Sequence, residues 1–162
     1  MVEGLGRRIE APADFAGDDG RIDAALDAAI SADDADAVLL ALCFGARLLV
    51  PVVAVADETD ADNGAGESGQ VAKRDGQAGS SATHMASVSL VQQDGRRGLL
   101  AFTCLDSLRR WDPSARPVPV LATAAARAAL DEGAHGLLVD VAGPVRFAVD
   151  GPALRRVAGF AP

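Results

Sequence analysis

The chain has 162 residues and a mass of 16.5 kDa, a length that fits one domain with attachments and leaves no room for two full domains. Its net charge of −8 opposes a phosphate backbone, and its five Phe, one Trp and no Tyr argue against a stacking platform for single-stranded nucleic acid. The charge is uneven, because residues 1–67 carry 15 acids and 4 bases while residues 68–162 carry 8 acids and 11 bases. We therefore expect no nucleic-acid partner and an acidic N-terminal part.

Targeting signals and membrane segments are not expected. The first residues, MVEGLGRRIEAPADF, carry charges and no apolar core, unlike a secretory signal. The longest apolar run, residues 48–56, is about half of what spans a bilayer. Two cysteines, Cys43 and Cys104, cannot form a disulfide framework, so the sequence predicts a reduced protein in the cytoplasm.

The N-terminal third begins with a segment of low order. Residues 1–20 are rich in Gly, Asp, Ala and Pro, which predicts a flexible arm. Ile22, Leu26 and Ile30 then recur at helical spacing and predict the first helix. The domain is therefore expected to begin at residue 21.

A second helix follows almost at once. Any of Ser31, Asp33 and Asp34 is suited to cap it, and Gly45 is suited to end it. The residues expected on its buried face are Val38, Leu39, Leu42 and Cys43.

Residues 47–55, RLLVPVVAV, are continuously apolar and rich in β-branched side chains, which predicts a strand buried on both faces. Pro51 donates no ladder hydrogen bond, so this strand lies at a sheet edge or is bonded on one side only at that residue. Residues 57–83 contain no Leu, Ile, Phe, Met or Trp and predict a disordered insertion. Whether that loop folds on contact with a partner stays open.

The second half alternates short apolar runs with turn signals. The expected elements, in order, are a hairpin of 85–92 and 98–103 across Asp94-Gly95, a helix at 104–111, a strand at 118–121, a helix at 124–132, a hairpin of 137–141 and 145–149 around Gly143-Pro144, and a helix at 153–158. Thr103 and Thr123 are the expected N-caps of the first two helices, and Asp106 completes a short form of the capping box. Hairpins mixed with strand–helix–strand crossovers predict an α/β (α+β) fold in one domain, residues 21–158, with a mixed sheet of five to six strands covered by helices.

The chain also resembles a known family. Phe102-Thr103 with Leu108, and Gly136, Asp140, Gly143 and Pro144, match the most specific motifs of the SseB N-terminal domain family, named for an enhanced-serine-sensitivity protein. The resemblance covers residues 20–158 and implies a soluble α/β domain of poorly defined biochemical role, with no catalytic residues to carry over. Asp140-Val141 stands where the family often has Asn-Pro, so whether the Asp140-Gly143-Pro144 corner is functional stays open.

Metal, cofactor and nucleophile motifs are not found. His84, His135 and the two cysteines show no CxxC, HxxxH or HExxH spacing, so we expect no metal and no cofactor. Cys104 in the first turn of a helix would favour the thiolate, but catalysis would also require one of the two histidines within reach. The sequence favours a packed cysteine.

A ligand-binding hypothesis comes from the helix N-termini. If strands 98–103 and 118–121 are parallel neighbours or near neighbours, the helices after them begin at the same sheet edge and could bind a small anion. The ligand-binding residues would then be Thr103, Cys104, Asp106 and Thr123, although capping threonines satisfy the same backbone donors without a ligand. The arginine pairs 96–97, 109–110 and 155–156 are expected on solvated faces unless folding gathers them.

We expect a non-enzymatic, cytoplasmic domain that binds a protein or small-ligand partner in an accessory or regulatory role. The alternatives are a small-anion sensor or enzyme that uses the helix N-termini at Thr103 and Thr123, and a structural partner subunit. An enzyme should show a concave pocket lined by titratable groups, whereas a binding module should show an exposed apolar patch. The oligomeric state is not predicted.

Overall fold

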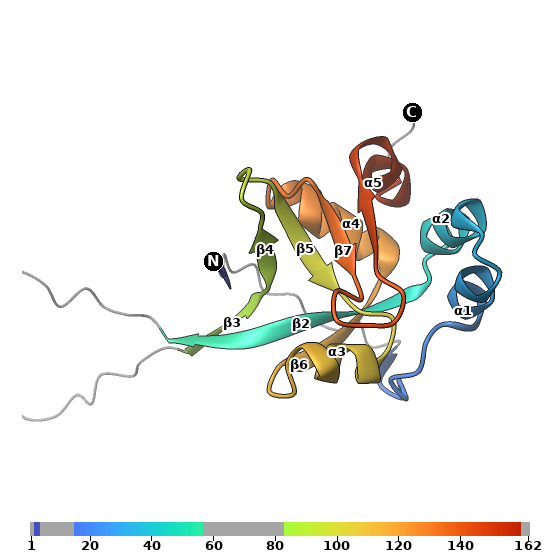
Figure 1. Cartoon of the computed structure of the whole chain (residues 1–162). Coiled ribbons are helices and arrows are strands. Elements are labelled where there is room, and N and C mark those ends of the chain that lie inside the picture. Colours follow the sequence, from blue (N-terminus) through green and yellow to red (C-terminus); the bar gives the residue numbers. More distant parts are fainter. Residues whose placement is uncertain (1, 4–14, 57–82, 160–162) are drawn as a thin grey trace, which may run out of the picture.

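The computed structural model describes residues 2–3, 15–56 and 83–159 (Figure 1). Its helices are α1 (Ala24–Ser31), α2 (Ala35–Cys43), α3 (Leu105–Trp111), α4 (Ala122–Asp131) and α5 (Gly151–Val157). Its strands are β1 (Val2–Glu3), β2 (Arg47–Ala56), β3 (Thr83–Ser87), β4 (Ser89–Val91), β5 (Arg97–Ala101), β6 (Arg116–Leu121), β7 (Gly136–Val139) and β8 (Phe147–Asp150). The mixed α/β class is confirmed.

The strands form two sheets, where the sequence predicted one. A five-stranded sheet has the order β1-β4-β5-β7-β8, with β5 and β7 parallel and the other pairs antiparallel. A three-stranded antiparallel sheet has the order β3-β2-β6. The two hairpins of the second half, β4–β5 and β7–β8, are confirmed.

The division into two sheets has a local cause at Val88. The sequence predicts one strand over 85–92, but β3 ends at Ser87 and β4 begins at Ser89, so the chain leaves one sheet and enters the other across a single residue. The sheets stay connected further on, because Leu49 and Phe102 exchange two backbone hydrogen bonds of 2.8 Å each. Local hydrophobic periodicity does not predict long-range strand pairing of this kind.

Two core clusters lie on opposite faces of the central strands. Successive residues of a strand point to opposite faces, and Leu48 and Val50 of β2 pack in one cluster while Leu49 packs in the other. The larger cluster lies under α1, α2, α4 and α5, and the smaller one lies under α3. The prediction that 47–55 is buried on both faces is confirmed for Leu48, Leu49, Val50 and Val52.

Pro51 lies in the central strand of its sheet. The ladder from β2 to β3 begins only at Val52, so Pro51 is paired with β6 alone, which confirms the second of the two arrangements expected. Leu49 gives both its backbone groups to Phe102, so its pair with Pro119 is not hydrogen-bonded. Antiparallel pairs alternate, and the Pro51–Pro117 pair therefore also needs no N–H donor.

The first two helices begin and end largely as expected. The Asp34 carboxylate accepts a bond from the Ala37 N–H at 2.9 Å and caps α2. Gly45, with φ of 85°, follows the end of that helix in the left-handed conformation that glycine adopts without strain. The cap of α1 is Asp23, whose side chain accepts from Ala25 and Leu26.

The N-terminal arm is shorter than the sequence predicts. Residues 15–20 were expected to be flexible, yet Asp18 pairs with Arg47 and the Gly20 carbonyl accepts from the Leu105 N–H at 2.8 Å. Residues 2–3 form β1 against β4. The predicted disordered loop, 57–83, lies outside the described residues except for Thr83, where β3 begins.

Candidate functional site

The four residues proposed for ligand binding lie at the starts of two helices. Thr103 and Cys104 occupy the junction between β5 and α3, Asp106 is exposed in the first turn of α3, and Thr123 lies in the first turn of α4. β5 is parallel to β7, while β6 belongs to the other sheet and pairs with β2. Strands 98–103 and 118–121 are thus not direct neighbours, but they run parallel as near neighbours, because β2 lies between them, antiparallel to β6 and bridged antiparallel to Phe102 through Leu49. The helices that follow pack over different core clusters, α3 over the smaller and α4 over the larger, so Thr103 and Thr123 are not brought together on one face of the sheet.

The predicted threonine caps are also wrong. Cys104 is the N-cap residue of α3 and Leu121 that of α4, and neither makes a side-chain capping bond. α4 starts two residues earlier than expected, so Thr123 falls inside its first turn. Thr103 instead uses its backbone N–H and its hydroxyl for a different partner.

That partner is Asp140, a carboxylate that is 5% exposed. One of its oxygens, Oδ1, accepts from the Thr103 N–H at 2.9 Å and lies 2.6 Å from the Ser107 hydroxyl, while Oδ2 accepts from the Thr103 hydroxyl at 2.6 Å. Hydrogen bonds to a carboxylate are stronger than those between neutral groups. The Thr103 N–H that the sequence offered to an anion is thus occupied by a carboxylate of the protein.

The backbone after β7 is shaped to present this carboxylate. Asp140 has a φ of 51°, a conformation that Asp tolerates better than most residues. Its carbonyl accepts from the Gly143 N–H at 2.8 Å, and a Cβ at Gly143 would lie 3.0 Å from the Cβ of Asp140. The glycine lets the turn close tightly over the junction.

The Ser107 hydroxyl links Asp140 to Cys104. It lies 2.6 Å from Asp140 Oδ1 and 3.4 Å from the Cys104 sulfur, and it has one proton to donate. The charged acceptor takes that proton in preference, which leaves the hydroxyl oxygen to accept from the thiol. The arrangement holds Cys104 in place within the junction.

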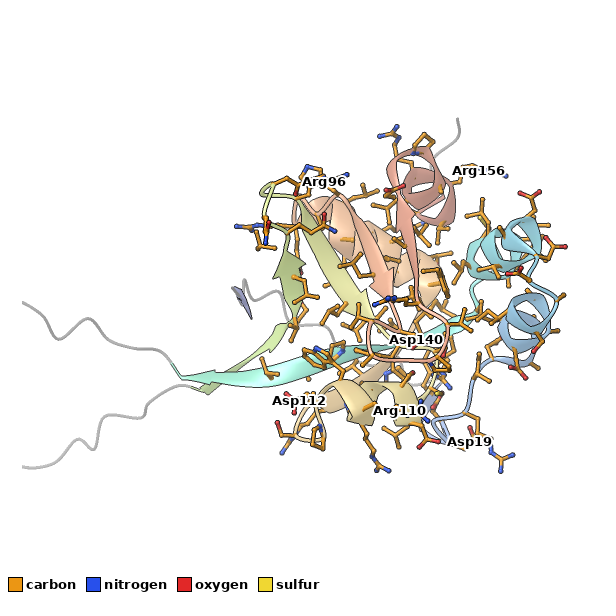
Figure 2. The ribbon with its side chains drawn as sticks, in the orientation of Figure 1. Asp19, Arg96, Arg110, Asp112, Asp140 and Arg156 are labelled. Atoms are coloured by element: carbon orange, nitrogen blue, oxygen red, sulfur yellow. The ribbon has the colours of Figure 1, made fainter. Side chains whose placement is uncertain are left out.

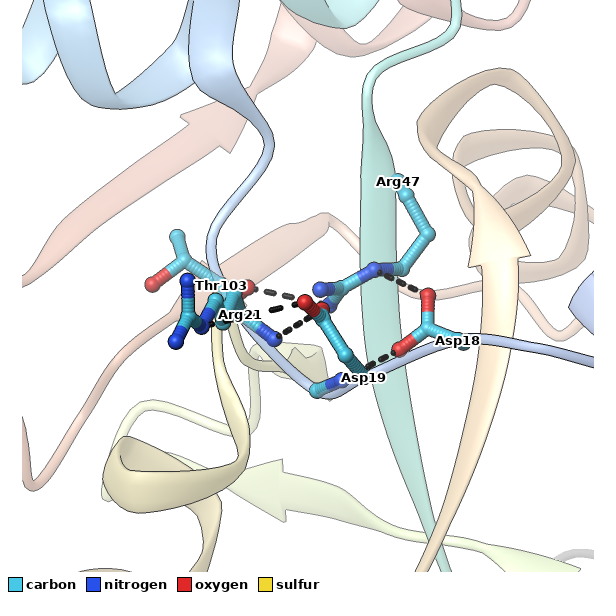
Figure 3. A network of polar contacts seen from close by, with 6 residues as sticks. Asp18, Asp19, Arg21, Arg47 and Thr103 are labelled. Atoms are coloured by element: carbon cyan, nitrogen blue, oxygen red, sulfur yellow. Dashed lines mark hydrogen bonds and ion pairs between the residues drawn. The ribbon is translucent and has the colours of Figure 1, made fainter.

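Arg47 ties the N-terminal segment to the same junction (Figure 3). Its guanidinium donates to the Thr103 carbonyl at 3.0 Å through Nη1, and its Nε lies 2.8 Å from an Asp18 carboxylate oxygen. Both side chains are largely buried, at 8% and 15% exposure, so solvent screens the ion pair only weakly. Asp18 also accepts from the Gly20 N–H at 2.8 Å, which orders the turn before α1.

Histidine and cysteine do not assemble into a metal or nucleophile site in the part of the chain that the structure describes. His135 Nδ1 accepts from the Arg97 N–H at the start of β5, whereas Cys104 follows the end of that strand. The side chain of His84 lies outside the described residues. Cys43 packs against the larger core cluster, and no group of three or more metal-ligating side chains occurs among the described residues.

The C-terminal part of α2 exposes large apolar side chains. Phe44 is 88% exposed and Leu40 51%, and the two stand four residues apart at the end of α2, hence on one face of the helix. Leu121 is 42% exposed and lies beside Gly45, where a Cβ would be 3.6 Å from its Cδ2. A groove of about 550 Å³ runs between the two helices, lined mainly by alanines together with Leu40 and Phe44. We call this surface the α1–α2 face.

A second groove of about 410 Å³ lies on the other side of α2. It is lined by Val38, Leu39 and Leu42 of the helix and by residues 145–149, of which Val145 is 49% exposed. Asp33, Asp34 and Asp36 also line it. We call it the α2–β8 groove.

A comparison with protein families decides the relationship. The model of the SseB protein N-terminal domain matches residues 22–156, most of the chain. The chain belongs to this family. No curated protein and no solved structure matches it.

The resemblance of the SseB domain to its family was carried in part by Asp140, and the structure shows what this residue does. Sequence reasoning treated Asp140 as a departure from an Asn-Pro pattern, whereas it is the acceptor for Thr103 and Ser107. The sequence analysis missed Arg47 as a junction residue, although its position as the one charged residue in RLLVPVVAV could have indicated a buried polar contact. Nothing in the sequence indicated Asp18, because its contact depends on how residues 15–20 fold back.

The arginine pairs of the SseB domain do not gather. Figure 2 labels one member of each pair: Arg96 beside the β4–β5 turn, Arg110 on α3 and Arg156 on α5, at three different parts of the surface. Each is exposed to solvent. None of the helices that the structure describes has the length and apolarity that crossing a bilayer requires.

Proposed function

We propose that this SseB domain is a non-enzymatic, cytoplasmic protein-binding module that acts in an accessory or regulatory capacity through the α1–α2 face. The observation that carries the proposal is the exposure of Phe44, Leu40 and Leu121 on neighbouring elements. Monomeric proteins seldom expose contiguous large apolar side chains, and those that do use them for partners or ligands. A domain that binds through this face would bury an aromatic side chain that the fold itself leaves in water.

The free energy available from burying Phe44 in an interface is sufficient for recognition. An aromatic side chain buries about 150–250 Å² when it enters an interface, which is about 4–6 kcal/mol at about 25 cal/mol per Å² before the costs of association. Exposed aromatic residues near the centre of an interface are frequent hot spots. Phe44 is therefore the residue from which we expect most of the binding energy.

The polar junction supports a structural role more than a catalytic one. Thr103 and Ser107 both bond Asp140, and the contacts of Arg47 are to Asp18 and to the Thr103 carbonyl. These contacts connect β5, α3, β7 and the N-terminal segment, which are the elements that the junction must hold together. A depression beside Cys104 is lined by residues 19–22, Ala24 and Asp27 and by the start of α3, and its titratable side chains Asp19, Arg21, Asp27 and Asp106 are exposed to solvent.

Site-specific photocrosslinking in the host cell tests the proposal. A photoreactive phenylalanine at position 44 should give a discrete protein adduct, and the same residue at position 145, in the α2–β8 groove, should not. The adduct should disappear when Leu40→Asp is added on the same face. No adduct from position 44, or equal adducts from both positions, would contradict the proposal.

A further inference from the structure

The α1–α2 groove has a floor that suits the close approach of another helix. Its lining includes Ala25, Ala28 and Ala32 from the first helix and Ala37 and Ala41 from the second. Small side chains allow helix backbones to approach closely, and two neighbouring helices present a groove into which the side chains of a third can pack. α1 has eight residues and α2 nine, so the groove is about 12–14 Å long and receives about two to three turns of a partner helix.

The large side chains of this face form a row along α2. Asp36, Leu40 and Phe44 are each four residues apart, so they lie one above the other on the helix surface, and all three are exposed. A helix that lies along the row would place an apolar side chain at Leu40 and another at Phe44. It would place its next turn beside the Asp36 carboxylate.

The charge of the helical hairpin decides the class of partner. Residues 23–44 contain five aspartates and no lysine, arginine or histidine. Asp23 lines one end of the groove, Asp33 and Asp34 lie in the connection between the helices, and Asp36, which lines the α2–β8 groove, is one helical turn before Leu40. Carboxylate oxygens project from both helices into solvent (Figure 2). A partner with positive charge on the flanks of its apolar stripe is complementary to this field.

The same charge argues against a second copy of this chain on the face. A symmetric dimer would bring identical surfaces together, and the aspartates of both hairpins would meet with no base in residues 23–44 to pair them. Anionic surfaces are disfavoured for the same reason. The partner must be a basic one.

We propose that the α1–α2 face receives an amphipathic helix of a partner protein, with apolar residues at i, i+4 and i+7 against Leu40, Phe44 and the alanine floor, and lysine or arginine beside Asp23 and Asp36. The proposal rests on the proposed function, since it names the partner class for the same face. Helix-in-groove recognition of this kind is read through a few apolar anchors at helical spacing.

Three synthetic 14-residue peptides and the full-length protein test the proposal. The first carries leucines on one helical face and lysines and arginines elsewhere; the second has glutamates in place of all the bases; the third has the composition of the first in an order without an apolar face. The readout is the change in backbone amide shifts of the ¹⁵N-labelled protein, with a Kd from each titration at low and high salt. The first peptide should shift residues of the α1–α2 face, bind most tightly, and weaken as salt rises.

Matched variants locate the contact. Phe44→Ala should weaken the first peptide about tenfold, and Val145→Ala, in the α2–β8 groove, should leave the Kd unchanged. Asp36→Asn should weaken it about two- to fivefold. Because Asp36 also lines the α2–β8 groove, that loss is assigned to the α1–α2 face only when Val145→Ala leaves the Kd unchanged. Asp27→Asn is the control, because Asp27 is likewise the acidic residue in the first turn of its helix but lines the depression beside Leu105 on the other side of α1.

The outcomes separate the partner class from the proposed function. Equal binding of the basic and acidic peptides, or equal effects of Asp36→Asn and Asp27→Asn, would contradict the proposal that the partner helix is basic. Neither result would contradict binding through the apolar α1–α2 face. Shifts centred on Val145, or none with any peptide, would overturn the helix proposal even if position 44 forms its adduct in the cell. If the photoreactive residue at position 44 forms no adduct in the otherwise unmodified protein, the proposed function itself is contradicted.

Discussion

The junction around Asp140 and the α1–α2 face differ in whether their side chains find partners within the fold. At the junction, a buried carboxylate is matched by three hydrogen-bond donors, and no buried side-chain nitrogen or oxygen of the described residues lacks a partner. On the α1–α2 face, Phe44 remains 88% exposed. The fold therefore depends on its internal polar contacts and does not depend on its most exposed aromatic side chain, which is left available for something outside the domain.

The largest expected effect is at the junction. Asp140→Ala removes the acceptor for the Thr103 N–H, the Thr103 hydroxyl and the Ser107 hydroxyl, and strands these donors in a buried place. We expect a loss of about 3 kcal/mol in the free energy of unfolding, measured by urea denaturation with an unchanged m-value. Asp140→Asn keeps one acceptor oxygen and tolerates the positive φ, so it should cost less than half as much. A loss below about 1 kcal/mol for the alanine variant would show that the junction is not the tightly coupled region described above.

The next effect tests how the N-terminal segment is held. Arg47→Met preserves the apolar stem but removes the bonds to Asp18 and the Thr103 carbonyl, and should cost about 2 kcal/mol in the free energy of unfolding. Asp18→Asn leaves the bond to Thr103 and should cost about 1 kcal/mol. Amide exchange at residues 18–20 should accelerate in both variants. Unchanged exchange there would mean that the ion pair does not order the segment.

Local elements of this fold could be predicted from the sequence because their causes are local. Gly45 ends α2, Asp34 caps it, and Asp94-Gly95 closes the β4–β5 hairpin, each by a backbone preference of one or two residues. The two-sheet arrangement was missed because it depends on a bend at Val88 and on a bridge from Leu49 to a residue 53 positions away. No periodicity within a strand reports which sheet the strand will join.

The same difference between local and long-range causes explains which contacts of the site residues could be predicted. Thr103 was taken as a helix cap because a threonine before a helix satisfies the local rule. A cap would use the Thr103 hydroxyl oxygen to accept an N–H of the first turn, whereas the Thr103 N–H and hydroxyl both donate to Asp140, 37 residues away in the sequence. The exposed position of Phe44 had a local signal: the buried face assigned to α2 leaves Leu40 and Phe44 on the other side of the helix.

Phe44 should contribute little to folding, in contrast to the junction. Phe44→Ser should change the free energy of unfolding by less than about 0.5 kcal/mol, because almost all of the side chain is already in water. Leu42→Ala, two residues away in the same helix but fully buried, should cost about 3 kcal/mol and serves as the control. A large loss for Phe44→Ser would contradict the separation between the α1–α2 face and the core.

The smallest effect concerns a carboxylate that accepts a backbone N–H in solvent instead of in the interior. The Arg96 backbone N–H, and then the Arg96 side chain, lower the pKa of Asp94 in the β4–β5 turn below its ordinary value of 3.8. A lowered folded pKa stabilises the native state above the unfolded pKa, and this contribution is lost as the pH falls through the folded pKa. Asp94→Asn should therefore lower Tm slightly at pH 6, and the difference from the unmodified protein should vanish at acidic pH below the folded pKa. Arg96→Gln should keep most of that pH dependence, since the backbone N–H is the larger cause, and a pH-independent difference for Asp94→Asn would show that the turn is stabilised by geometry alone.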